Sequence, residues 1–143
     1  MKYEIKNICC IGAGYVGGPT MAVIADKCPH IQVNVVDINK ERVKQWNDID
    51  LERLPIYEPG LADIVKRSRG KKLHFSNFIR ENIKKADMVF ISVNTPTKTK
   101  GVGAGKASDS KWLEARGVAK YYVCHNILVE NSTLPAKTAE VIK

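Results

Sequence analysis

The sequence has no apolar run close to the roughly 20 residues that a membrane-spanning helix needs. Its start, Met1-Lys2-Tyr3-Glu4, lacks the apolar core of a signal peptide. The 4 cysteines include no Cys-x-x-Cys pair, and the 3 histidines show no paired ligand spacing. These absences argue against a membrane protein, a disulfide framework and a metal site. We therefore expect a cytoplasmic protein with reduced cysteines.

Aromatic residues make up only 7% of the 143 residues, whereas charged residues make up 27% and leave a net charge of +8. Most cations are interleaved with acids, as at 39–42 and 80–87, which is typical of a solvated helix face. The dense patch at 66–72 fits a helix end and a turn, where cations suit the helix dipole. Because no aromatic interleaving accompanies the charge, we expect no nucleic-acid partner.

A glycine-rich turn follows the first apolar run, Ile8-Cys9-Cys10-Ile11. Gly12, Gly14 and Gly17 form the pattern Gly-x-Gly-x-x-Gly between this predicted strand and a predicted helix. In such a motif the first glycine allows a tight turn, and the second lets the backbone approach a pyrophosphate. The third allows the helix to pack closely on the strand. The context predicts a phosphate grip at the amino end of the helix.

An acidic residue ends the second apolar run, residues 31–36, at the distance that a dinucleotide fold requires. Asp37 follows Gly17 by about 20 residues, where a carboxylate meets the adenosine ribose hydroxyls. A carboxylate at this position would repel the 2′-phosphate of NADP, so the pattern favours NAD. A flavin or nucleotide-sugar site on the same fold stays open as an alternative.

Apolar runs alternate with helical patterns along the chain, which predicts an α/β fold with a doubly wound parallel sheet of the Rossmann type. The chain is expected to form one domain over residues 1–143 and to stop inside a helix after the fifth strand. Prolines at 55 and 59 make residues 48–59 the main irregular insertion. We expect strands near 6–12, 31–37, 72–76, 87–93 and 126–131, and helices near 15–27, 40–47, 59–68, 79–85, 109–122 and 135–142.

A second polar cluster follows the predicted strand that begins at Met88. Ser92, Asn94, Thr95 and Thr97 come where this strand ends, and ligands lie at the carboxyl ends of strands in open α/β sheets. The next residues, 100–107, differ from a P-loop, because Lys and Ala replace the first glycine and the final Ser or Thr. We interpret them as a loop over the site.

Several strings closely resemble the UDP-glucose 6-dehydrogenase family. Tyr-Glu-Pro-Gly at 57–60 and Val-Asn-Thr-Pro-Thr at 93–97 are more specific than any glycine triplet. The glycine turn at 12–20, Val-Val-Asp at 35–37 and Ser-Thr-Leu-Pro at 132–135 extend the resemblance over nearly the whole chain. The family oxidises UDP-glucose to UDP-glucuronate in two NAD-dependent steps through a covalent intermediate on a cysteine. It implies a homo-oligomer for the full-length enzyme.

The resemblance also implies roles for individual residues. Asp37 and Arg42 would hold the adenosine ribose side, and Thr133 would lie by the nicotinamide and position the catalytic water. The other implied cofactor contacts are Gly12, Ala13, Gly14, Tyr15, Val16, Gly17, Val93, Asn94, Thr95, Pro96, Thr97, Ser132 and Leu134.

The family's nucleophilic cysteine lies in a glycine-rich string followed by Phe and Lys, and this sequence has no such string. We therefore expect the chain alone to be inactive as an enzyme, with UDP-glucose bound only when the missing domains are present. Gly117 within a predicted helix and Asn131 before Ser-Thr depart from the family's pattern. A free-standing NAD-binding module without catalysis, or the cofactor domain of a GDP-mannose dehydrogenase, are the alternatives.

Overall fold

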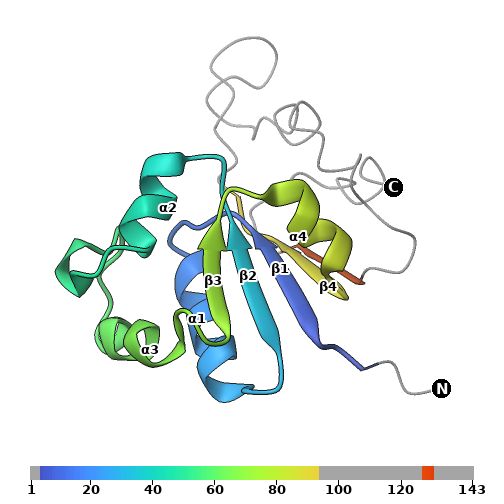
Figure 1. Ribbon diagram of the computed structural model, residues 1–143, viewed down its shortest axis with the longest axis horizontal. Coiled ribbons are helices and arrows are strands. Elements are labelled where there is room, and N and C mark those ends of the chain that lie inside the picture. The colour runs from blue at the N-terminus through green and yellow to red at the C-terminus, as the bar shows by residue number, and fades with distance from the viewer. Residues whose placement is uncertain (1–3, 94–126, 131–143) are drawn as a thin grey trace, which may run out of the picture.

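The computed structural model describes residues 4–93 and 127–130 (Figure 1). Within them the chain forms a parallel sheet in the order β3-β2-β1-β4-β5. Every expected strand is present, and its ends differ from the predicted ones by at most two residues. The strands are β1 (Asn7–Ile11), β2 (Gln32–Val36), β3 (Leu73–Ser76), β4 (Met88–Ile91) and β5 (Ile127–Glu130).

In the described residues, four α-helices and one 3₁₀-helix lie between β1 and β4. They are α1 (Gly17–Lys27), α2 (Lys40–Trp46), η1 (Leu51–Arg53), α3 (Leu61–Ser68) and α4 (Ile79–Lys85). The expected helix over 15–27 begins two residues later, because the glycine turn continues to Val16. Likewise, the helix expected from Pro59 begins at Leu61, because Gly60 takes a left-handed conformation with φ 83° at the cap. The predicted helices at 109–122 and 135–142 and the loop at 100–107 lie outside the described residues.

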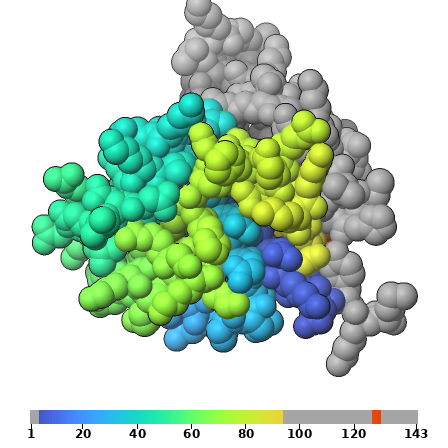
Figure 2. Space-filling model, viewed as in Figure 1, coloured from blue at the N-terminus to red at the C-terminus, as the bar shows by residue number. Residues whose placement is uncertain are grey.

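The helices cover both faces of the sheet. In Figure 1, α4 lies in front of the strands and α1 behind them. One apolar cluster joins α1, α3 and Trp46 of α2 to the sheet face that carries Cys10, and a second joins Ile83 of α4 to the face that carries Cys9. Figure 2 shows the α4 side, where α4 (yellow-green) and α2 (cyan) cover the upper part of the molecule. The adjacent cysteines therefore point to opposite faces, as their alternation on a strand predicts.

The order of the strands places a switch point between β1 and β4. The sheet extends from β1 through β2 to β3 on one side, and through β4 to β5 on the other. In a doubly wound sheet, ligands bind outside the carboxyl ends of the strands at this point. The turn after β1 and the segment after β4 both begin there.

Candidate functional site

The glycine turn after β1 is tightly packed at its two outer glycines and open at the middle one. Gly12 has φ 108°, and a Cβ there would lie 2.2 Å from the carbonyl oxygen of Ser92. A Cβ on Gly17 would lie 2.1 Å from the carbonyl oxygen of Gly12. In contrast, a Cβ on Gly14 would meet no atom of the described residues within 4 Å. The geometry fits a tight turn at Gly12 and close packing of the helix at Gly17. The space before Gly14 would admit a ligand that approaches the backbone, and that role stays a prediction.

The amino end of α1 faces the same space. Gly18 N–H donates to the Gly14 carbonyl at 3.1 Å, at the start of the helix. Among the described residues, no side chain caps the helix at Val16, and no acidic residue lies in its first turn. The amide groups that precede the first helical hydrogen bonds have no partner inside a helix, and the helix dipole gives them positive character. This end of α1 is suited to an anion such as a phosphate.

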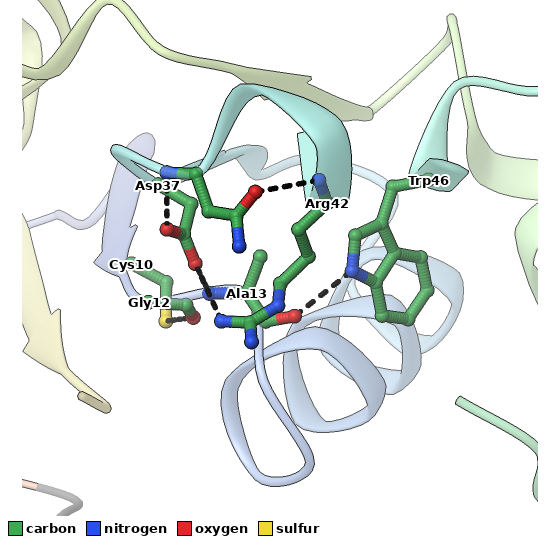
Figure 3. Close-up of polar contacts among 7 residues, drawn as sticks. Cys10, Gly12, Ala13, Asp37, Arg42 and Trp46 are labelled. Atoms are coloured by element: carbon green, nitrogen blue, oxygen red, sulfur yellow. Dashed lines mark hydrogen bonds and ion pairs between the residues drawn. The ribbon is translucent and has the colours of Figure 1, made fainter. Parts of the chain in front are cut away.

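Asp37 is the one acidic residue among the predicted contacts, and it lies buried at the end of β2 with 7% exposure. Its Oδ2 accepts a hydrogen bond from Ala13 N–H at 2.9 Å, and its Oδ1 accepts one from Asn39 N–H at 2.8 Å (Figure 3). Arg42 Nη1 lies 3.3 Å from Oδ2 as an ion pair. The carboxylate therefore joins the end of β2, the glycine turn and the start of α2.

Helix α2 places Arg42 beside Asp37. The side chain of Asn39 caps this helix and accepts from the Arg42 backbone N–H at 3.1 Å. Because the helix begins at Lys40, shortly after β2 ends at Val36, its first turn places Arg42 beside the carboxylate. The Arg42 side chain is about one-third exposed. The two residues expected at the ribose side are therefore in contact, and the charge of Asp37 is partly balanced.

Trp46 belongs to the site although the sequence analysis did not identify it. It is fully buried, and its indole Nε1–H donates to the Ala13 carbonyl at 2.9 Å (Figure 3). The indole also stacks on Phe75 with ring centroids 4.6 Å apart. In the sequence, a tryptophan at the end of a short helix indicates an ordinary core residue. Only the hydrogen bond across 33 positions shows that Trp46 contacts the glycine turn.

Ser92 and Val93 extend from β4 beside the glycine turn. Ser92 N–H donates to the Ile11 carbonyl at 2.8 Å, and a Cβ on Gly12 would lie 3.2 Å from Val93 Cγ1. The buried Ser92 hydroxyl has no hydrogen-bond partner among the described residues. The expected contacts Asn94, Thr95, Pro96, Thr97, Ser132, Thr133 and Leu134 lie outside the described residues.

Tyr15 and Val16 are the exposed residues of the turn. Tyr15 is 76% exposed and Val16 is 50% exposed. Their side chains therefore project away from the core, whereas Ala13 is buried and held by both Asp37 and Trp46.

The buried cysteines of β1 lie beneath this site. Burial raises the pKa of Cys9 to about 12 and raises the pKa of Cys10 further still. The negative charge of Asp37, and that of Cys9 at a pH high enough to ionise it, also raise the pKa of Cys10. Its Sγ donates to the Gly12 carbonyl at 3.6 Å. Both thiols are protonated near neutral pH, which excludes them as nucleophiles there.

In the part of the chain that the structure describes, no group of three or more His, Cys, Asp or Glu side chains is placed to bind a metal ion. No helix of the described residues is long and apolar enough to cross a membrane. The metal-free site and the cytoplasmic location expected from the sequence stay predictions.

Comparison with known proteins identifies relatives across the chain. The family model described as "UDP-glucose/GDP-mannose dehydrogenase family, NAD binding domain" matches residues 6–143. UDP-glucose 6-dehydrogenase 3 of Arabidopsis thaliana is 59% identical over 139 residues, which cover 96% of this chain and 28% of that protein. UDP-glucose 6-dehydrogenase 3 of Oryza sativa subsp. japonica is 58% identical over the same shares.

A solved structure agrees with these relatives. A UDP-glucose dehydrogenase from the archaeon Pyrobaculum islandicum matches with a TM-score of 0.76 and 26% identity. The match covers 97% of this chain and 32% of that one. The chain therefore spans about a third or less of the length of the relatives that it matches.

Proposed function

The chain belongs to the NAD-binding domain of the UDP-glucose/GDP-mannose dehydrogenase family, and we propose that it binds NAD at the turn between β1 and α1. The single observation that carries the proposal is the arrangement around Gly14. An open approach to its backbone lies at the amino end of α1, and the buried carboxylate of Asp37 lies at the end of the neighbouring strand. A dinucleotide needs a pyrophosphate grip and a ribose acceptor at these two positions.

In this proposal, the backbone of residues 12–17 binds the pyrophosphate and Asp37 accepts hydrogen bonds from the adenosine ribose. Arg42 orients the Asp37 carboxylate, and Val93, Asn94, Thr95, Pro96 and Thr97 contact the middle of the cofactor. Ser132, Thr133 and Leu134 lie towards the nicotinamide, where Thr133 positions water. NAD, when bound, supplies the hydride acceptor of the reaction.

The substrate proposed for the whole protein is UDP-glucose, oxidised to UDP-glucuronate with two NAD. The relatives at 57–60% identity that support this choice are UDP-glucose 6-dehydrogenases. We propose that the whole enzyme is a homo-oligomer. We also propose that the 143-residue chain turns over no substrate by itself, because the family's cysteine string does not occur in it. Burial of Cys9 and Cys10 supports this view.

Calorimetric titration of the chain with NAD and with NADP tests the cofactor assignment. We expect NAD to bind and NADP to bind much more weakly. At about 4 Å and an effective dielectric constant of about 20, two like charges repel by about 4 kcal/mol. Equal or tighter binding of NADP would refute the role of Asp37.

A separate assay tests the proposed lack of turnover. The chain is mixed with NAD and UDP-glucose, and NADH absorbance is followed. We expect no increase in NADH absorbance, since the substrate must be held against the nicotinamide and a thiolate must capture the aldehyde. Clear production of NADH that depends on UDP-glucose would show that this chain supplies both the substrate site and the thiolate.

A further inference from the structure

We propose that Trp46 is a positioning residue for the cofactor. Its indole N–H fixes the peptide between Ala13 and Gly14, so that the Gly14 amide N–H faces the bound pyrophosphate. The proposal rests on the NAD binding proposed above and adds a residue of α2 that lies 33 positions from the glycine turn.

One buried hydrogen bond fixes the peptide unit between Ala13 and Gly14. Trp46 Nε1–H donates to the Ala13 carbonyl at 2.9 Å, and both residues are buried, with exposures of 0% and 1%. A trans peptide is planar, so its C=O and N–H groups point in opposite directions. The Ala13 carbonyl and the Gly14 N–H belong to the same peptide. When the indole fixes the carbonyl towards the core, it directs the Gly14 N–H the other way, away from Trp46. Among the described residues, the space that a Cβ on Gly14 would occupy is also free of other atoms.

The preceding peptide, between Gly12 and Ala13, is fixed as well. Asp37 Oδ2 accepts from the Ala13 N–H at 2.9 Å, which sets the direction of the Gly12 carbonyl. Ala13 is therefore held at both of its backbone groups, by a carboxylate from β2 and an indole from α2 (Figure 3). A grip that is ordered before the ligand arrives loses less conformational freedom on binding.

The Trp46 indole is itself rigidly placed. A Cβ on Gly18 would lie 2.2 Å from Trp46 Cζ2, so the ring lies directly on the first turn of α1. Phe75 stacks on its other side with an interplanar angle of 6°. Arg69 Nη1 donates to the Trp46 carbonyl at 2.7 Å and fixes the end of α2. These contacts place the N–H donor of the ring and the start of α1 in one rigid unit.

A purely structural role for Trp46 makes a different prediction from a positioning role. If the indole only fills the core, its loss lowers thermal stability, and the fraction that stays folded binds NAD as before. If it also orients the Gly14 amide, NAD affinity falls at temperatures where the protein is fully folded. NAD affinity measured well below the melting transition therefore separates the two roles.

The test compares Trp46→Phe with a matched core variant. Trp46→Phe removes the N–H donor and keeps an aromatic ring beside Phe75. Val65→Ala, in α3 of the same apolar cluster, lowers stability without touching the glycine turn. We expect NAD to bind Trp46→Phe about 3- to 10-fold more weakly than the unmodified chain, as for the loss of one net hydrogen bond. The affinity of Val65→Ala should be unchanged. Unchanged affinity in Trp46→Phe, or an equal loss in both variants, would overturn the proposal.

A second variant decides the question if Trp46→Phe does not fold. In a Trp112→Phe background, Trp46 is replaced by 3-benzothienylalanine, which has sulfur in place of the N–H and nearly the same shape. We expect weaker NAD binding than in the Trp112→Phe parent, and equal binding would overturn the proposal. If the unmodified chain binds no NAD, the proposed function itself fails. If it binds NAD and both Trp46 variants bind it equally well, only the role of Trp46 fails.

Discussion

The carboxylate of Asp37 accepts a hydrogen bond from the backbone N–H of Ala13 at 2.9 Å, across 24 positions of the chain. It links the end of β2 to the glycine turn after β1, so Asp37 supports the turn and also stands at the expected ribose position. A substitution of Asp37 should therefore change stability and cofactor choice together.

We expect Asp37→Ala to weaken NAD binding and to narrow the gap between NAD and NADP. Loss of the carboxylate leaves two backbone N–H groups without their acceptor, which costs about 1–3 kcal/mol of stability. It also removes the like charge that opposes the 2′-phosphate and frees Arg42 to pair with that phosphate. Calorimetry with both cofactors and a thermal melt measure these effects.

Arg42→Ala is the matched control for this prediction. It keeps the carboxylate and its bonds to Ala13 and Asn39, so discrimination against NADP should remain. A ratio of NADP to NAD affinity that does not change in Asp37→Ala would contradict the assignment of Asp37.

Gly14→Val and Gly17→Val should separate cofactor binding from folding. In the part of the chain that the structure describes, a Cβ on Gly14 meets no atom within 4 Å, so the variant should fold and lose NAD binding by about 100-fold or more, equivalent to about 2.7 kcal/mol. A Cβ on Gly17 would lie 2.1 Å from the Gly12 carbonyl, so Gly17→Val should lose stability by at least about 1–3 kcal/mol. Circular dichroism melts and calorimetry distinguish the two results. Normal NAD binding by Gly14→Val would place the grip elsewhere.

The thiols of Cys9 and Cys10 should not react in the folded protein. Burial raises the pKa of Cys9 to about 12 and that of Cys10 further, so neither is a thiolate at pH 8. In a Cys28→Ser, Cys124→Ser variant, we expect a disulfide reagent to label both thiols only after denaturant is added. Rapid labelling in buffer alone would show that β1 opens readily.

The ion pair between Asp26 of α1 and Arg67 of α3 should give a small stability difference that depends on pH. The hydrogen bond and charge of Arg67 lower the pKa of Asp26. Because the folded pKa is the lower one, the pair's contribution is complete above the ordinary Asp value of about 3.9. It is lost as pH falls through the folded value. The melting temperatures of the unmodified chain and Asp26→Asn should therefore converge in acid and in high salt. A gap that widens in acid would contradict the assignment.

The sequence predicted all five strands and the four described α-helices, because their signals are local. Apolar runs, prolines, caps and the glycine turn each act within a few residues of the chain. The two-residue errors in the helices lie at their starts, where the fold decides which residue takes the first helical conformation. Gly60 is an example, because its left-handed φ delays α3 to Leu61.

The position of the candidate site could also be predicted, whereas the support beneath it could not. Gly12, Gly17 and Asp37 occur at spacings that dinucleotide binding dictates. The contacts of Trp46 with Ala13 and Gly18 connect segments about 30 positions apart, and no periodic pattern records such a pairing. For Asp37, the sequence spacing predicts only that its carboxylate faces a ribose. Its bonds to Ala13 and Asn39 emerge only from the packed structure.

The most direct test of the proposed site is an NMR titration of the ¹⁵N-labelled chain with NAD, followed through the backbone amide signals. We predict that the largest shifts occur at the amides of Gly14, Tyr15, Val16 and Gly17, with further changes from Asp37 to Arg42. The amides of α4 should change little, because α4 packs in the second apolar cluster, on the face of the sheet opposite to α1. Shifts concentrated on α4, or no shifts at millimolar NAD, would contradict a cofactor site at the turn between β1 and α1.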